Sequence, residues 1–179
     1  AQVAQMNDPY VREIYSVTDA IKARVPGLRE GLMARRDTFG EPMKQPDRPG
    51  LISPITAIPV ETDPVRTEMS RLQIDIHKAP SSISLPSGPD KKLGQVKLTP
   101  EQRDIFGDVA GHQAYQILSP IVNDPAWKTT PDLVKKRIYD KVFEKTNKAG
   151  KAAALTPEQR AQEAQRITES LKKQLEAPE

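Results

Sequence analysis

The sequence predicts a mainly α-helical fold: about five short-to-medium helices joined by long proline-rich extended segments, non-compact, with order completed by partners. Helix-start pairs of Asp-Pro or Thr-Pro recur along the chain and precede residues with helical apolar spacing. Seventeen prolines against nine glycines indicate stiffened connections. Apolar residues make up only 36 % of the chain, below the roughly 45–50 % of globular domains, so burial within the chain leaves little surplus over conformational entropy.

Five helix starts are predicted by an Asp or Thr that directly precedes a proline. In Asp8-Pro9 and Asp63-Pro64, Asp is the expected N-cap and Pro takes the first helical position, where its missing N–H costs nothing. Thr-Pro pairs do the same at residues 99, 130 and 156. Apolar residues at helical spacing follow each start: Tyr10, Ile14, Val17 and Ile21; Val65, Met69, Leu72 and Ile76; Ile105, Phe106, Val109, Ala110, Ile117 and Leu118; Val134, Ile138 and Val142; Ala164, Ile167, Leu171 and Leu175.

These starts divide the chain into four regions. We expect an N-terminal helix in residues 1–25 and a proline-rich extended arm in 26–97, with one short helix at about 64–77. A helical pair is expected in 98–150, and a C-terminal helix in 151–179. The hexapeptide Leu98 to Arg103 recurs as Leu155 to Arg160, and the similarity does not extend into the following helices. One efficient helix start used twice is therefore the favoured interpretation.

Apolar residues outside the predicted core are the candidate partner contacts. Residues 40–62 contain five prolines and cannot form a central strand, yet they are more apolar than a linker requires. We expect this stretch to lie across a partner surface, and the thin apolar stripe of the last helix to dock on one neighbour. The candidate partner-binding residues are Leu51, Ile52, Ile55, Ile58, Val60, Trp127, Ile167, Leu171 and Leu175.

Trp127, the only tryptophan, stands in Asn123-Asp-Pro-Ala-Trp127 between the third and fourth helices. The favoured interpretation is an anchor that packs in the hinge and fixes the angle between these helices. The alternative is an interface hot spot, since Trp is enriched at such positions.

The motifs of common catalytic sites do not occur in this sequence. There is no phosphate-binding glycine loop, no G-x-S-x-G element, no cysteine, and no metal-ligand spacing around His77 or His112. Glu101 and Asp104 lie three residues apart, where negative charge suits the helix dipole, so electrostatic capping is their favoured role. We expect a non-enzymatic chain with no catalytic, cofactor-binding or metal site, and with no small-molecule substrate.

Charge is abundant, 28 % of residues, but nearly balanced at +3. The basic clusters Arg35-Arg36, Lys91-Lys92, Lys135-Lys136-Arg137 and Lys172-Lys173 are interleaved with acids. A solvated helix face is therefore favoured over a nucleic-acid site, which requires a dominant positive field. No apolar run approaches the roughly 20 residues that span a bilayer, and no signal-peptide pattern opens the chain. Because the first residue is Ala, we expect a piece of a longer protein.

The order of several motifs resembles a known family. The run Arg24-Val-Pro-Gly-Leu-Arg-Glu-Gly-Leu32 is followed by Arg36-Asp-Thr-Phe-Gly-Glu-Pro42, Ile52-Ser-Pro-Ile55 and Asp63-Pro-Val65. Lys97-Leu-Thr-Pro-Glu-Gln102, Ala110-Gly111, Asp124-Pro-Ala-Trp127 and the basic fourth helix follow. Over roughly residues 20–150 this resembles the C-terminal associated domain of large polyvalent proteins of tailed bacteriophages and prophages. Met33-Ala34 stands where that family has a Pro pair, and Phe39 where Trp is common.

The resemblance implies a segment of a giant virion protein that is carried inside the capsid near the portal, after synthesis in the host cytoplasm. The expected function is structural: anchoring an internal (ejection) protein to the portal or inner-core assembly for genome delivery. Expected partners are the portal protein or other inner-core proteins in multiple copies on a ring; DNA contact is incidental, and membrane contact follows ejection, if it occurs. Two alternatives are a capsid, scaffold or tail-connector accessory protein, and an enzyme-associated domain of a giant virion polymerase or muramidase.

Overall fold

A computed structural model describes residues 8–45, 61–87 and 92–176 of the chain. In these residues the protein is mainly helical and has five α-helices, which confirms the mainly α-helical part of the predicted fold class. They are α2 (Val17–Lys22), α3 (Pro64–Arg71), α4 (Pro100–Val122), α5 (Asp132–Ala154) and α6 (Pro157–Glu176). Two 3₁₀ helices, η1 (Arg29–Gly31) and η2 (Pro125–Thr129), and a two-stranded sheet of β1 (Ser82–Ser87) and β2 (Lys92–Lys97) complete the elements.

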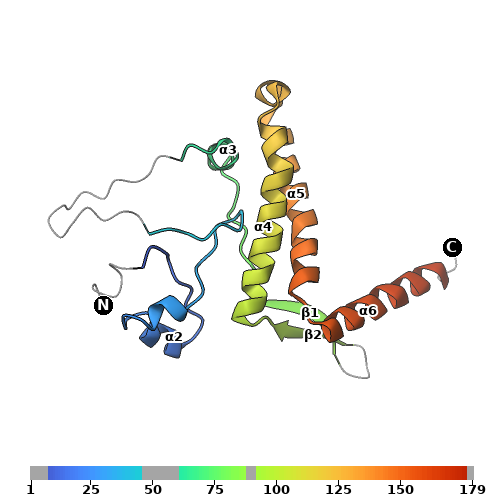
Figure 1. Cartoon of the computed structure of the whole chain (residues 1–179). Coiled ribbons are helices and arrows are strands. Elements are labelled where there is room, and N and C mark those ends of the chain that lie inside the picture. Colours follow the sequence, from blue (N-terminus) through green and yellow to red (C-terminus); the bar gives the residue numbers. More distant parts are fainter. Residues whose placement is uncertain (1–7, 46–60, 88–91, 177–179) are drawn as a thin grey trace.

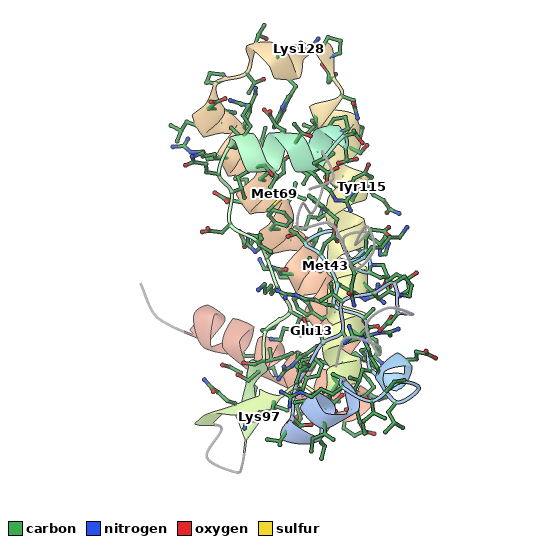
Figure 2. All side chains as sticks on the ribbon, turned by 90° about the vertical axis from the view of Figure 1, so that its left-hand side faces the viewer. Glu13, Met43, Met69, Lys97, Tyr115 and Lys128 are labelled. Carbon is green, nitrogen blue, oxygen red and sulfur yellow. The ribbon has the colours of Figure 1, made fainter. Side chains whose placement is uncertain are left out.

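Helices α4 and α5 form an antiparallel hairpin that organises the rest of the molecule (Figure 1). Helix η2 closes the hairpin at one end, and α3 lies across it near that end (Figure 2). The β-hairpin and the start of α6 lie at the opposite end, from which α6 extends away from the α4–α5 pair (Figure 1). Helix α2 belongs to a separate N-terminal lobe beside α4.

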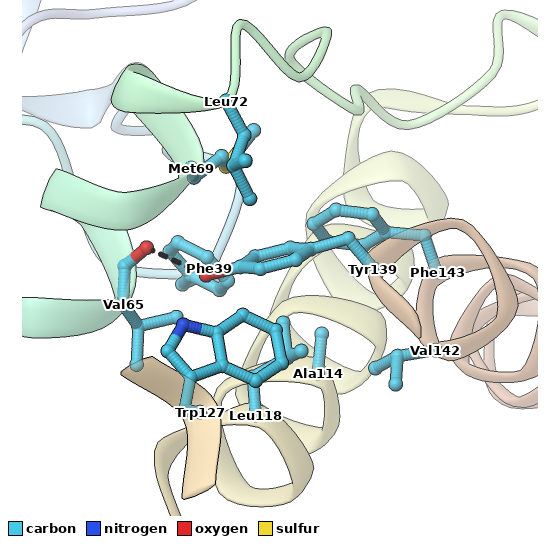
Figure 3. Close-up of a cluster of buried hydrophobic side chains, with 10 residues drawn as sticks. All are labelled: Phe39, Val65, Met69, Leu72, Ala114, Leu118, Trp127, Tyr139, Val142 and Phe143. Atoms are coloured by element: carbon cyan, nitrogen blue, oxygen red, sulfur yellow. Dashed lines mark hydrogen bonds between the residues drawn. The ribbon is translucent and has the colours of Figure 1, made fainter. Parts of the chain in front are cut away.

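The core fills the space between α3, α4, α5 and the turn that carries Phe39 (Figure 3). Tyr139 is fully buried, and its hydroxyl donates a 2.9 Å hydrogen bond to the carbonyl oxygen of Val65. This bond satisfies a phenol that would otherwise be an unpaired polar group in the interior. Buried around it are Phe39, Val65, Met69, Leu72, Ala114, Leu118, Trp127, Val142 and Phe143.

Small residues let α4 and α5 approach closely. A Cβ added to Gly150 of α5 would lie 2.9 Å from both the Cβ of Ala110 and the carbonyl oxygen of Phe106 in α4. On another side of α4, Gly111 receives the backbone of the turn at Phe39-Gly40. This turn requires a positive φ of 82° at Gly40, a conformation that glycine adopts without the steric cost of a Cβ.

The structure confirms two of the predicted capping threonines. The Thr99 side chain accepts a hydrogen bond from the Gln102 backbone N–H, while the Gln102 side chain accepts one from the Thr99 N–H. Thr156 and Gln159 form the same reciprocal pair at the start of α6. Each box satisfies two backbone donors that a helix start leaves unpaired.

The two copies of the hexapeptide also meet in space. The Gln102 amide donates to the Gln159 side-chain oxygen at 3.1 Å and to the Ala154 carbonyl at 3.0 Å. Leu98 and Leu155, the first residues of the two copies, are buried in one cluster with Ile83. The repeat is thus an efficient helix start used twice and, in addition, a joint that connects α4 to α6.

We expect Thr99→Ala to lower the free energy of unfolding by about 1 kcal/mol, because it removes an N-cap. Gln102→Ala should cost more, since Gln102 both closes its own box and bonds to α6. Hydrogen exchange measured residue by residue checks this: Gln102→Ala should reduce protection at the starts of both α4 and α6. Thr99→Ala should reduce it at α4 alone, and unchanged protection in both variants would contradict the assignment.

The first predicted helix start is wrong. Residues 8–15 are not helical, and α2 begins after Ser16, whose side chain forms a capping box with Asp19. Asp8 is instead a buried carboxylate that pairs with Arg12 (2.8 Å) and Arg29 (2.7 Å). An Asp-Pro pair signals a helix only through local capping, and here a distant arginine supplies a stronger, charge-assisted partner.

Two other helix boundaries differ from their predicted positions. Helix α3 starts after Asp63 as predicted, but it ends at Arg71 because Gln73 adopts a positive φ of 54°. Ile76, predicted on its apolar face, is exposed. Helix α5 has Pro131 as its N-cap, while the Thr130 hydroxyl donates back to the Ala126 carbonyl of η2.

Much of the predicted arm has defined pairing in the described residues. Isolated β-bridges join Tyr10 to Lys44, Arg12 to Ala34 and Arg36 to Pro42, so residues 26–45 form a lobe with the N-terminal segment. Residues 82–87 pair with residues 92–97 in an antiparallel two-stranded sheet, in which Ile83 is opposite Val96. Pro86 is tolerated because each strand of a two-stranded sheet has a free edge. The hairpin was not predicted.

Candidate functional site

The nine predicted partner-binding residues fall into three groups. Leu51, Ile52, Ile55, Ile58 and Val60 lie outside the described residues, so their role stays a prediction. Ile167, Leu171 and Leu175 lie on α6, as predicted, and the structure does not describe their side chains. Only Trp127 can be placed with its contacts.

Trp127 is a core residue. Its side chain is buried, and its ring packs 6.2 Å from that of Tyr139. The indole N–H donates a 3.0 Å hydrogen bond to the Glu68 carboxylate. These contacts support the hinge-packing interpretation, because Trp127 fixes η2 and α5 against α3. Its surface is not available to a partner in this conformation.

The Glu68 carboxylate has three hydrogen-bonding or ion-pair partners where η2 and α5 meet α3, a contact that we call the hinge. Besides Trp127, it accepts hydrogen bonds from Arg71 (2.8 Å), and the ammonium of Lys135 lies 3.2 Å away. The Arg71 bonds, followed by those of Lys135 and Trp127, outweigh desolvation and lower the pKa of Glu68 to about 2. Glu68 is therefore ionised at neutral pH and holds the hinge electrostatically.

The prediction that Lys135 belongs to a solvated face is wrong. Its side chain is 7 % exposed, pairs with Glu68 and lies 5.2 Å from the Trp127 ring centroid. Sequence reasoning missed this cluster because Glu68 and Lys135 come from helices 67 residues apart. The one signal in the sequence was helical spacing: Lys135 stands four residues before Tyr139 and seven before Val142, on the side of the helix that these apolar residues predict to be buried.

A second ionic cluster joins the N-terminal lobe to α4. The Arg36 guanidinium donates to both oxygens of Asp104 (2.6 and 2.9 Å), to Asp108 (2.8 Å) and to the Gly40 carbonyl (2.6 Å). The structure thus assigns Asp104 to a bidentate ion pair rather than to the predicted electrostatic cap. His112, with its ring exposed, lies beside Asp108 and Glu41 at the edge of this cluster.

A groove of about 330 Å³ opens next to this cluster. Its lining includes Phe106, Gly107 and Phe143, together with residues of the N-terminal lobe and of the segment 77–79 after α3. The three carboxylates of its lining are already paired: Asp104 with Arg36, Asp37 with Arg66, and Glu13 with Arg35. This pairing suits a joint between the lobe and the helices, because Arg36 with Asp104 and Asp37 with Arg66 link the lobe to α4 and α3.

The N-terminal lobe carries the largest group of exposed apolar side chains that the structure describes. Helix α2 buries none of its residues, and Val17 is 79 % exposed. Backbone hydrogen bonds from Arg24 to Ile21 and from Val25 to Lys22 continue its winding, so Val17, Ile21 and Val25, at spacings of four, lie on one side. We call the exposed apolar side chains of α2 and its flanks the apolar row: Ile14, Tyr15, Val17, Ile21, Val25 and Leu28. Of these, Tyr15 packs against Arg103.

The described residues contain no group of three or more His, Cys, Asp or Glu side chains arranged to hold a metal ion. No helix among them is long and apolar enough to cross a membrane.

The fold and these clusters define a mainly α-helical protein, built on an antiparallel helix hairpin with an ion-paired N-terminal lobe. No known protein family, curated protein or solved structure matches the chain.

Proposed function

We propose that this chain is a non-catalytic structural segment of a phage internal virion (ejection) protein. In this proposal it anchors the parent protein to the portal or inner-core assembly, where several copies meet a ring of partner subunits. The proposal combines the motif order of residues 20–150 with the apolar row of the N-terminal lobe.

The apolar row is the observation that carries the proposal. Large apolar side chains scattered singly over a surface need no explanation, whereas a contiguous set marks an interaction site. Val17 and Ile21 are four residues apart on α2 and are 79 % and 60 % exposed. Leu28, 54 % exposed, follows seven residues later, beyond the end of α2 and the turn at Gly27. Together they offer a partner an apolar anchor without requiring the fold to open.

The construction of the lobe supports the same role. Its buried ion pairs, from Asp8 to Arg12 and Arg29, hold the segment that carries α2, and the Arg36 cluster fixes that segment to α4. Rigid presentation reduces the entropy lost when a partner binds. An exposed row on a fixed lobe therefore favours binding to another protein over chemistry.

The test replaces Val17, Ile21 and Leu28 together by Ser in the parent protein and measures its copy number in purified virions. We expect at least about a tenfold loss of incorporation, because each side chain contributes on the order of 1.5–3 kcal/mol when fully buried. The fold should persist, since α2 buries none of its residues; circular dichroism checks this.

A matched control replaces Ile76, Ile105 and Leu133 by Ser. These side chains are 68 %, 43 % and 64 % exposed, outside the apolar row. The control should be incorporated normally. Normal incorporation of the first variant would remove the apolar row from the interface and with it the main support for the anchoring role.

A further inference from the structure

The outer face of α5 carries a row of positive charges. Tyr139, Phe143 and Thr146 are buried on the inner face of α5. Because an α-helix turns 100° per residue, the side chains of Arg137, Lys141, Lys145 and Lys148 lie around the opposite, outer side. All four are exposed. The row follows spacings of four, four and three residues along one face of the helix.

The acids that interrupt this row in the sequence neutralise only part of it in the fold. Asp132 is drawn to Arg71 of α3, at 2.6 Å. Lys135 is buried and pairs with Glu68, so it does not contribute to this outer face. Glu144 pairs with Lys148 at 2.7 Å, and Asp140 is exposed at the edge of the face.

What remains is a positive surface. Its exposed cations are Arg137, Lys141, Lys145 and Lys148, and the exposed acids beside them are Asp140 and Glu144. The face therefore carries an excess of two positive charges. Among the described residues, no carboxylate lies within ion-pair distance of Arg137, Lys141 or Lys145.

We propose that the outer face of α5 binds the phosphodiester backbone of nucleic acid. A rise of about 1.5 Å per residue places Arg137 and Lys148 roughly 16 Å apart along the helix axis. One strand of a duplex carries a phosphate about every 3.4 Å of its axis, so the row can follow four or five phosphates. Helix α5 packs along α4 (Figure 1), so the row is carried on a supported helix.

The same face lacks the features that read bases. Specific recognition requires side chains that enter a groove and pair with base edges, and recognition of single strands uses aromatic side chains for stacking. The aromatic residues of α5, Tyr139 and Phe143, are buried in the core. The structure therefore assigns binding by charge, independent of sequence. This inference does not depend on the proposed anchoring role, because the apolar row lies on the N-terminal lobe and not on α5.

The experiment titrates the full chain into a fluorescently labelled 20-base-pair DNA duplex and follows anisotropy at several salt concentrations. If about four phosphates are neutralised, the logarithm of the binding constant should fall with the logarithm of salt with a slope near −3.6. Two duplexes of unrelated sequence should bind equally. No binding at about 20 mM salt, or a clear preference for one sequence, would overturn the proposal.

Three variants locate the surface. Lys141→Gln and Lys145→Gln should each reduce the magnitude of the slope by about 0.9 and weaken binding. Glu144→Gln should strengthen binding, because it removes a negative charge and frees Lys148. The controls are Lys22→Gln and Lys44→Gln, which replace exposed cations of the N-terminal lobe. They should have little effect on DNA binding. Equal losses in controls and α5 variants, or weaker binding by Glu144→Gln, would exclude this face.

Discussion

Replacing Gly111 by Ala should lower the free energy of unfolding by at least about 3 kcal/mol. A Cβ at this position would lie 2.7 Å from the Cα of Gly40 and closer still to the Gly40 nitrogen and the Phe39 carbonyl carbon. Both neighbours are backbone atoms, so no side chain can rotate away. Relief requires the whole turn to move, which withdraws Phe39 from the core, where it is 2 % exposed.

Gly107 provides the matched control on the same helix. A Cβ there would meet only the flexible side chain of Arg36, at 3.4 and 3.9 Å. Ala is favoured over Gly inside a helix by roughly 0.5–1 kcal/mol, so Gly107→Ala should be neutral or slightly stabilising. Urea denaturation of both variants decides the point. If Gly111→Ala unfolds at the same urea concentration as Gly107→Ala, the turn does not pack on α4 as described.

The sequence was sufficient for features that depend on neighbours in the chain. The capping box at Thr99 needs only Gln102, three residues on, and the box at Thr156 needs only Gln159. Apolar spacing identified the buried face of α5 only in part: Val142 is buried, but Val134, predicted on the same stripe, is 42 % exposed. The capping boxes follow from local geometry, so they survive whatever tertiary structure surrounds them.

Features that depend on distant partners could not be predicted in this way. Asp8 has the local surroundings of an N-cap, but Arg29, 21 residues away, draws it into a buried ion pair. Asp104 sits near a helix start, yet Arg36 binds it across 68 residues. Lys135 stands among solvated cations in the sequence, and only the fold brings it to Glu68. In each case a charge-assisted pair outweighs a local preference of about 1 kcal/mol.

The apolar row of the N-terminal lobe illustrates the same limit. Tyr10, Ile14, Val17 and Ile21 have the spacing of a helix that packs against a core, and the sequence predicted one. In the fold α2 is short and buries none of its residues, so Val17 and Ile21 face outward. Periodicity identifies which residues share a face; only the surrounding lobe determines whether that face is covered.

The hinge carboxylate should be the second most sensitive position. We expect Glu68→Ala to cost about 3 kcal/mol, because it leaves Lys135 as an unpaired charge with a side chain only 7 % exposed and the Trp127 N–H without its acceptor. Lys135→Met should cost about 1 kcal/mol or less, since Glu68 keeps Arg71 and Trp127 as partners. A double variant, Glu68→Ala with Lys135→Met, should recover part of the stability that Glu68→Ala loses. If the double variant recovers none of it, Glu68 and Lys135 do not form the ion pair described here.

The same carboxylate predicts how stability depends on pH. Glu68 has a pKa of about 2 in the folded protein against 4.5 in the unfolded chain, so the unfolded state binds the proton more readily and stability rises with pH across this range. The contribution is complete above about pH 4.5 and is lost as the pH falls toward 2. Its size is roughly 3 kcal/mol, at about 1.4 kcal/mol per pKa unit. Asp8, with its pKa lowered from 3.8 to about 2 chiefly by the Arg12 hydrogen bonds, adds a loss of the same sign.

Urea denaturation between pH 6 and pH 2.5 tests this dependence with Glu68→Gln, which keeps the size of the side chain and removes its titration. We expect the wild type to lose stability more steeply than Glu68→Gln below pH 4.5, so that the two curves converge as the pH falls. The Asp8 contribution, common to both proteins, should remain as a shallower slope in the variant. Parallel curves would mean that Glu68 does not gain its stabilising partners on folding, and the hinge of Trp127, Glu68 and Lys135 would have to be discarded.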